Sequence, residues 1–273
     1  MVTASRVLSV EQSGHVAILW LDNPERRNAL GPEFWEDLPA LMRQLSDDSA
    51  VRAIVIAAKG PHFTVGLDLK AFGGTLGGGE GSSEAARRTR LLGNIKRLQA
   101  SITAVADCPK PVLAAVQGYC LGGGVDLITA CDIRLASADA VFSIRETKIA
   151  LVADVGTLQR LPAIVGEGHV AELAFTGKDI TAARAREIGL VNDVLPDPTA
   201  LAAATRELAG EIAANSPLAV QGTKAVLRAC KGRSIAEGLD YVAVWNAAFV
   251  QSSDLGEAMA AFAEKRAPRF TGT

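Results

Sequence analysis

The stretch that decides the fold runs from Lys110 to Asp132 and reads KPVLAAVQGYCLGGGVDLITACD. Its apolar run at 112–116 has the length and β-branched ends of a buried strand. Gln117 and Gly118 break this run, and residues 122–124 are three consecutive glycines. From Val125 onward the apolar spacing is typical of a helix. The stretch therefore predicts a strand, a glycine turn and the start of a helix.

The glycine turn can be interpreted in two ways. Glycine lets the backbone come close to a ligand, and the free N–H groups of a first helical turn point toward negative charge. Asp126 lies within that turn. The other reading is tight packing of the helix against its neighbours. A dinucleotide-binding loop is excluded because the glycines are consecutive and lack the G-x-G-x-x-G spacing.

Composition excludes several classes of protein. The formal net charge of −2 argues against binding to nucleic acid, because there is no basic excess to contact phosphates. A membrane span is not expected, since the glycine triplet and Asp126 interrupt the apolar run. The three histidines are dispersed, which argues against a metal site or a Ser-His-Asp triad. We interpret the cysteines as reduced residues of the core: Cys108, Cys120, Cys131 and Cys230.

We expect a cytoplasmic protein. Glu11 and Gln12 interrupt any signal-like segment at the start of the chain, and the final residues FTGT are not a peroxisomal signal.

The first part of the chain alternates strands and helices. Strands are predicted at 16–21, 53–58, 133–136 and 141–144, and helices at 32–45 and 83–106. The recurring order of strand, loop and helix predicts stacked β-β-α units. The glycine-rich residues 73–83 are interpreted as a mobile loop and a candidate lid.

The last part of the chain is predicted to be helical, with helices at 199–214, 217–229 and 235–249. These helices carry more apolar side chains than one chain can bury, which favours a trimer or larger assembly. We expect a core at 1–200 that holds the active site. A helical region at 201–273 would serve in oligomerisation and form part of the active-site cover.

Two further acids stand beside apolar residues. Glu146 follows a predicted strand, and Asp154 follows the uncharged run 149–153. Poor solvation and a neighbouring carboxylate would both raise the pKa of such acids, which suits proton transfer near neutral pH. The structural alternative is that Asp154 caps a helix starting near Gly156 and that Glu146 pairs with Lys148 or Arg145.

Five motifs carry a family resemblance: NPERRNAL at 23–30, FTVGLDL at 63–69, KPVLAAVQG at 110–118, GGGVD at 122–126 with CDIR at 131–134, and TLQRLP at 157–162. Over nearly its whole length the chain resembles the enoyl-CoA hydratase/isomerase (crotonase) superfamily. The resemblance implies an α/β fold, a spiral of β-β-α repeats with a helical carboxy-terminal trimerisation region. It also implies a homotrimer or homohexamer.

The same resemblance implies an acyl-CoA thioester substrate, with no metal and no redox cofactor. The superfamily holds the thioester oxygen with two backbone N–H groups, which correspond to Leu67 and Gly123. Removal of an α-proton places charge on that oxygen, which preorganised donors stabilise. The resemblance also places substrate or CoA contacts at Val65, Gly66, Asp68, Leu69, Lys70 and Gly122.

Three acidic residues, Asp126, Glu146 and Asp154, indicate which activity of the superfamily this chain resembles. Hydratases of the superfamily carry glutamates at the positions of Asp126 and Glu146, and typically glycine at the position of Asp154. The set found here resembles the dienoyl-CoA isomerases, which convert 3,5-dienoyl-CoA to 2,4-dienoyl-CoA in fatty acid β-oxidation. Glu146 and Asp154 would then exchange protons with C2 and C6, with Asp126 as third member.

Two alternatives remain. One is a 2-enoyl-CoA hydratase or another crotonase-type lyase or isomerase that uses Asp126 and Glu146. The other is a non-catalytic member that binds acyl-CoA or RNA.

Overall fold

The centre of the molecule is a six-stranded sheet with the strand order β1-β2-β3-β4-β6-β9. The computed structural model describes residues 5–76 and 83–273. All neighbouring strands of this sheet run parallel, except that β1 pairs with β2 in the antiparallel sense. The strands are β1 (Leu8–Ser13), β2 (Val16–Leu21), β3 (Ala53–Ala58), β4 (Val112–Val116), β6 (Ile133–Ser137) and β9 (Asp193–Leu195).

A second sheet of three short strands has the order β5-β7-β8. These strands are β5 (Tyr119–Leu121), β7 (Val141–Ser143) and β8 (Ile180–Thr181). Along the chain, β4 in the large sheet is followed by β5 in the small one, and β6 is followed by β7. The chain thus winds from one sheet to the other and back, and the predicted spiral of β-β-α repeats is confirmed.

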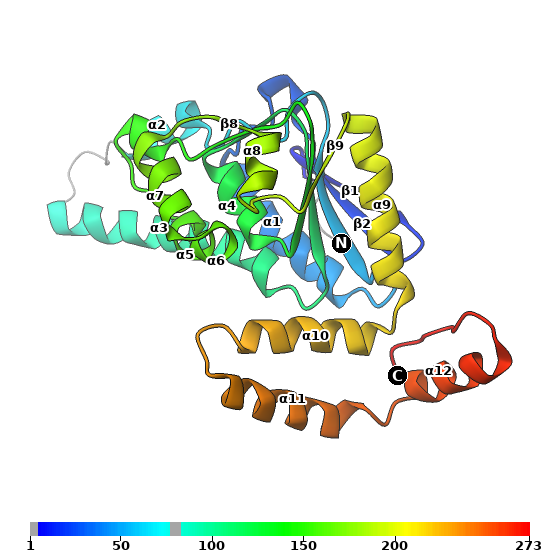
Figure 1. The fold of residues 1–273 in the computed structure, drawn as a ribbon. Coiled ribbons are helices and arrows are strands. Elements are labelled where there is room, and N and C mark those ends of the chain that lie inside the picture. The colour runs from blue at the N-terminus through cyan, green and yellow to red at the C-terminus, as the bar shows by residue number, and fades with distance from the viewer. Residues whose placement is uncertain (1–4, 77–82) are drawn as a thin grey trace.

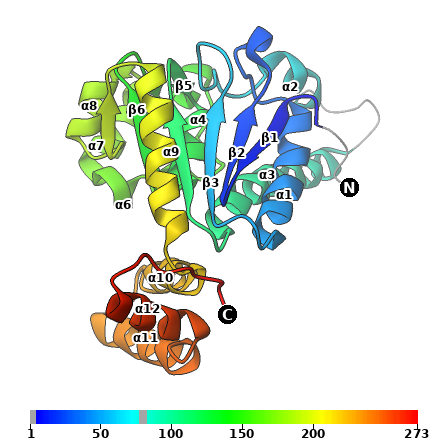
Figure 2. The same cartoon turned by 90° about the vertical axis from the view of Figure 1, so that its right-hand side faces the viewer.

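The large sheet is covered on both faces (Figures 1 and 2). Helices α1 (Pro32–Asp47), α3 (Glu84–Asp107) and α4 (Gly123–Ala130) lie on one face, and α9 (Pro198–Ala214) lies on the other. Strand β3 contributes Ile54 and Ile56 to the first core and Val55 to the core under α9. Burial on both faces explains why this strand is continuously apolar rather than alternating.

Helix α1 begins as its sequence predicts. Pro32 occupies the first turn, where its missing N–H removes no hydrogen bond. The apolar side chains at helical spacing are all buried: Phe34, Leu38, Leu41, Met42 and Leu45. Helix α3 begins at Glu84 because the Ser83 hydroxyl accepts the Ala86 N–H at 3.2 Å.

Short helices complete the body around the small sheet. They are η1 (Pro24–Arg26), α2 (Leu69–Leu76), η2 (Glu146–Ile149), α5 (Thr157–Arg160), α6 (Pro162–Val165), α7 (Glu167–Thr176) and α8 (Ala182–Glu187). The predicted lid at 73–83 overlaps the end of α2, and its residues 77–82 lie outside the described part of the chain.

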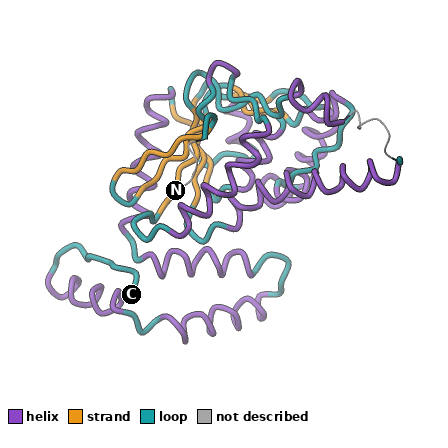
Figure 3. The backbone as a smooth tube through the Cα atoms, turned by 180° about the vertical axis from the view of Figure 1, so that it is seen from behind, coloured by secondary structure: helices purple, strands orange, loops and turns teal. Residues whose placement is uncertain are grey.

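Three carboxy-terminal helices stand apart from the α/β body (Figures 1 and 3). They are α10 (Pro217–Ala229), α11 (Ile235–Phe249) and α12 (Ser253–Glu264). The predicted boundary at residue 200 falls inside α9, which packs on the sheet through Leu201, Ala209 and Ala213. The helices that stand apart therefore begin at Pro217.

An ion pair between a buried ammonium and an exposed carboxylate anchors α10 to the body. The ammonium of Lys224 lies 2.6 Å from Oδ2 of Asp132 and donates to the carbonyl of Lys110 at 2.9 Å. The same Asp132 oxygen accepts the Val112 N–H at the start of β4. The C-terminal layer is therefore tied to the central strand by a charge held in a poorly solvated place.

Candidate active site

The glycine turn of the central stretch forms one wall of a cavity of about 530 Å³. Gly122 has a φ of +51°, a conformation that favours glycine. A Cβ at Gly122 would lie 3.3 Å from Oε1 of Glu146, so the bare backbone leaves room for that carboxylate. A Cβ at Gly124 would lie 2.5 Å from Thr64. Gly124 therefore allows close packing, as the second interpretation expects, and Gly122 faces the cavity.

Two backbone N–H groups with no hydrogen-bond partner among residues 5–76 and 83–273 belong to residues of this wall, Leu67 and Gly123. Leu67 forms a parallel bridge with Leu30, in which Leu30 donates to Gly66 and Asp68 donates to Leu30. The N–H of Leu67 therefore points to the opposite side. Gly123 is the first residue of α4, so its N–H has no partner within the helix. Gly66 brings the two segments together, because a Cβ there would lie 3.5 Å from the Gly123 nitrogen.

Asp126 is fully buried in the first turn of α4. Its Oδ1 accepts the N–H of Thr157 at 2.6 Å, while Oδ2 has no partner among the described residues. Burial raises the pKa of Asp126 to about 6, and the hydrogen bond from Thr157 opposes the rise. Asp126 is therefore an acid near neutrality with one oxygen free.

Glu146 follows β7 and opens η2. Its Oε2 is buried and has no partner in the described chain. Burial, and after it the charge of Asp126, raise the pKa of Glu146 to about 7. A carboxyl group with that pKa takes up and releases protons readily near neutral pH.

Asp154 lines the same cavity from the loop before α5. Its backbone carbonyl accepts the side-chain amide of Gln99, on α3, at 2.7 Å. Partial desolvation raises the pKa of the Asp154 carboxyl. Three acids, from α4, from η2 and from the loop before α5, therefore border one cavity, and each has its pKa raised by its surroundings.

The structural alternatives for these acids do not hold. The residue that caps α5 is Gly156, and no side chain caps that helix. Arg145 pairs with Asp179, with 2.6 Å between Nη2 and Oδ1. Within the described ranges, no ion pair joins Glu146 to Arg145 or Lys148.

Four of the six predicted substrate contacts line the cavity: Val65, Gly66, Leu69 and Gly122. Asp68 and Lys70 do not. The buried Asp68 carboxylate lies 2.7 Å from Arg26 and accepts the N–H groups of Lys70 and Ala71. It therefore starts α2 and supports the strand segment that ends at Leu67. The side chain of Lys70 is exposed and outside the cavity wall.

Other cavity residues were not predicted. Arg27, which has a φ of +51°, and Arg145 bring positive charge to the wall. Most of the remaining wall is apolar, formed by Trp35, Leu98, Tyr119, Leu121, Ile149, Leu151, Val152 and Val155. The position of Arg145 next to Glu146 in the sequence could have indicated that Arg145 lies at the site. No local sequence feature indicates that Leu98, in the middle of α3, lines the cavity.

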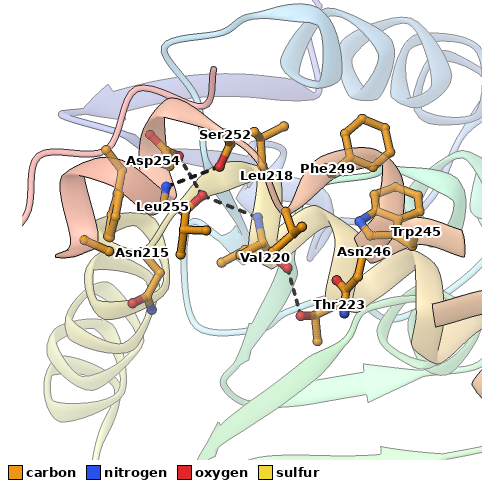
Figure 4. Close-up of a pocket in the computed structure, with 15 residues that line it drawn as sticks. Asn215, Leu218, Val220, Thr223, Trp245, Asn246, Phe249, Ser252, Asp254 and Leu255 are labelled. Atoms are coloured by element: carbon orange, nitrogen blue, oxygen red, sulfur yellow. Dashed lines mark hydrogen bonds between the residues drawn. The ribbon is translucent and has the colours of Figure 1, made fainter. Parts of the chain in front are cut away.

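A second cavity, of about 470 Å³, lies between α10, α11 and α12 (Figure 4). Its wall includes Trp245, Phe249 and Thr223, all labelled in the close-up. The one acid in this wall is Asp254, whose carboxylate accepts from Ser216 and from the N–H groups of Thr271 and Gly272. These bonds lower its pKa and hold the tail, so this acid is structural.

Two general properties of the described residues bear on function. No helix among them combines the length and the hydropathy needed to cross a bilayer. Residues 5–76 and 83–273 also contain no group of three or more His, Cys, Asp or Glu side chains arranged to hold a metal ion.

Comparison with known proteins places this geometry in a class. The family model described as enoyl-CoA hydratase/isomerase matches residues 11–273. A crystal structure of enoyl-CoA hydratase from Bacillus anthracis superposes with a TM-score of 0.89 at 30% identity, covering 98% of this chain and 100% of that one. The chain belongs to the enoyl-CoA hydratase/isomerase family.

Within that family, the chain is similar to proteins named Delta(3,5)-Delta(2,4)-dienoyl-CoA isomerase. The Dictyostelium discoideum protein is 44% identical, over 98% of this chain and 92% of its own length. The Arabidopsis thaliana protein is also 44% identical, over 92% of this chain and 91% of its own.

The names of these relatives correct one prediction. The Dictyostelium protein is named mitochondrial and the Arabidopsis protein peroxisomal, so the expected cytoplasmic location is wrong. The error has a physical basis. Receptors recognise short targeting segments, and the folded domain carries little information about cellular location.

Proposed function

We propose that this chain isomerises 3,5-dienoyl-CoA thioesters to 2,4-dienoyl-CoA thioesters. The observation that carries the proposal is the meeting of Asp126, Glu146 and Asp154 at one cavity whose wall also holds the glycine turn. The names of the Dictyostelium and Arabidopsis relatives support the same activity.

The reaction needs two proton transfers at separate carbons. Removal of a proton from C2 yields a trienolate, and addition of a proton at C6 moves the double bonds from C3 and C5 to C2 and C4. Glu146 lies on η2 and Asp154 on the loop before α5, which suits acid and base groups that serve carbons four bonds apart. Asp126, buried behind them, tunes their protonation and orients the substrate.

The thioester oxygen becomes negative when the trienolate forms. In the proposed mechanism the N–H groups of Leu67 and Gly123 donate to this oxygen, and such preorganised donors are each worth about 10²–10³ in rate. Val65, Gly66, Leu69 and Gly122 then contact the substrate near the reacting carbons. The isomerisation is redox-neutral, so the proposal includes neither a metal nor a redox cofactor.

We further propose a homotrimer or homohexamer held by the C-terminal helices. Along α11 only Gly238 is buried, although most of the helix is apolar. Ile235 is 84% exposed on α11, and Phe262 is 85% exposed on α12. Association would bury these side chains. Sedimentation equilibrium tests this: a monomer at micromolar concentration would contradict it.

The test of activity is spectrophotometric. Purified protein is given a 3,5-dienoyl-CoA, and the conjugated 2,4-dienoyl absorbance is followed. In parallel it is given a 2-enoyl-CoA, whose absorbance disappears on hydration. We expect fast conjugation with little hydration. Hydration without conjugation would replace the proposal with a hydratase that works through the free oxygens of Asp126 and Glu146.

A further inference from the structure

Behind the three acids, the side chain of Arg160 folds back over the loop that leads into α5. Its Nη1 donates to the carbonyl of Val155 at 3.3 Å. A Cβ at Gly156 would lie 1.7 Å from this same Nη1, so the guanidinium occupies the space above that glycine. Gly156 has a φ of +132°, which also favours glycine. The loop backbone and the guanidinium are thus packed as one unit.

The same guanidinium ties the loop to α3. Its Nη2 donates to Oγ1 of Thr103 at 3.1 Å. One turn earlier on that helix, Gln99 donates to the carbonyl of Asp154. Because residues four apart share a helix face, Gln99 and Thr103 form one polar edge along which the loop is held. Contacts with α3, one of them made by Arg160, therefore hold Asp154 at the cavity.

Arg160 also reaches Asp126 through α5, which is only four residues long. Thr157, at its start, donates its N–H to Asp126, and Arg160 is its last residue. The titratable groups that act on or respond to Asp126 are Asp154, Glu146 on η2, Cys120 on β5 and Arg160. Among these described groups, Arg160 is the one cation. The groups that act on Arg160 are Asp126 and, from α3, Asp107.

We propose that Arg160 is a positioning residue for the acids of this cavity. Its guanidinium holds the loop of Asp154 against α3, and its charge favours the ionised form of Asp126 beside Glu146. Arg160 is not part of the cavity wall, so it acts through these acids and not on the substrate. The role of the acids in turnover rests on the proposed function, whereas the effect of Arg160 on their pKa values does not.

Two substitutions separate the two roles. Arg160→Gln removes the charge, and Arg160→Lys keeps the charge but removes the fork that joins Val155 to Thr103. Arg206→Met is the matched control, because Arg206 lies on α9, on the other face of the sheet, and pairs with Glu11. Arg160→Met serves as a second neutral variant if the glutamine variant does not fold.

The first readout needs no substrate. Carboxyl titration is followed by ¹³C NMR, with Asp126→Asn and Glu146→Gln used to assign the signals. We expect Arg160→Gln to raise the apparent pKa values of the coupled Asp126–Glu146 pair by about one unit, the effect of losing a nearby opposite charge. Arg160→Lys should move them much less, and Arg206→Met should not move them. Unchanged titration in both neutral variants would overturn the electrostatic role.

The second readout is the pH profile of kcat/KM with 3,5-dienoyl-CoA. In Arg160→Gln the acid limb should move upward by the same amount. In Arg160→Lys the limb should stay while kcat falls about 10-fold or more, because Asp154 is less well held. If both variants lose the same fraction of kcat and the acid limb of the pH profile does not move, Arg160 contributes only to packing. If the wild-type protein does not conjugate the substrate, the proposed function fails, and the NMR titration still decides the inference.

Discussion

Replacement of Glu146 by glutamine tests whether the cavity holds a destabilised carboxyl group. Glutamine has nearly the same shape as protonated glutamic acid but does not ionise. The buried Oε2 of Glu146 has no partner among the described residues, and the protonated acid already places one unpaired donor there, so the amide adds at most one further unpaired N–H. The substitution therefore removes the charged form and little else.

The pKa of this residue sets the size of the effect. Burial and the charge of Asp126 raise it from 4.5 to about 7. Each tenfold change in acid dissociation is worth about 1.4 kcal/mol, so ionisation of Glu146 weakens the folded state by about 3 kcal/mol. Since the folded pKa is the higher one, stability is full below about pH 4.5 and declines as pH rises toward 7. Glu146→Gln should be spared this decline.

Urea unfolding at pH 5 and at pH 8 measures the difference. We expect the wild type and Glu146→Gln to agree within about 1 kcal/mol at pH 5, and the variant to be more stable by about 2–3 kcal/mol at pH 8. Its isomerase activity should fall about 10²–10⁴-fold, the usual effect of losing an acid/base group. Glu211→Gln, at an exposed site on α9, is the matched control and should change neither. Parallel decline of the wild type and Glu146→Gln from pH 5 to pH 8 would refute the reasoning.

Three further predictions concern Asp154 in the loop before α5, Gly66 beside the oxyanion donors, and the C-terminal anchor Lys224. Asp154→Asn should nearly abolish isomerisation with an unchanged circular dichroism spectrum; a wild-type kcat would contradict the two-base mechanism. Gly66→Ala should lower kcat about 10²-fold by displacing an oxyanion donor, because its Cβ would lie 2.6 Å from the Leu121 carbonyl at a φ of +86°. Gly14→Ala, also at positive φ but in open space, is its control and should retain kcat. Lys224→Met removes a buried ammonium that binds the exposed Asp132 carboxylate and the Lys110 carbonyl, and should lower the free energy of unfolding by about 1.5–3 kcal/mol in urea titration; a loss below about 1 kcal/mol would show that the anchor is dispensable.

Much of the fold could be predicted because its signals are local. The strands at 16–21, 53–58 and 112–116 have the predicted bounds, as do the helices Pro217–Ala229 and Ile235–Phe249. Continuous apolar runs and helical periodicity carry that information within a few residues. Strands β1, β5, β8 and β9 and helix α12 were not predicted. Three of these strands, β5, β8 and β9, have only two or three residues, and each pairs with a strand from another part of the chain.

The candidate site divides in the same way. The sequence by itself determined the acids, the glycine turn and, through its motifs, the family. Tertiary structure decided which groups pair. It pairs Asp68 with Arg26 and Arg145 with Asp179, and it leaves the buried Oε2 of Glu146 without a partner among the described residues. Hydrogen-bond partners, burial and the resulting pKa shifts depend on residues brought together from distant parts of the chain, and no local pattern encodes those distances.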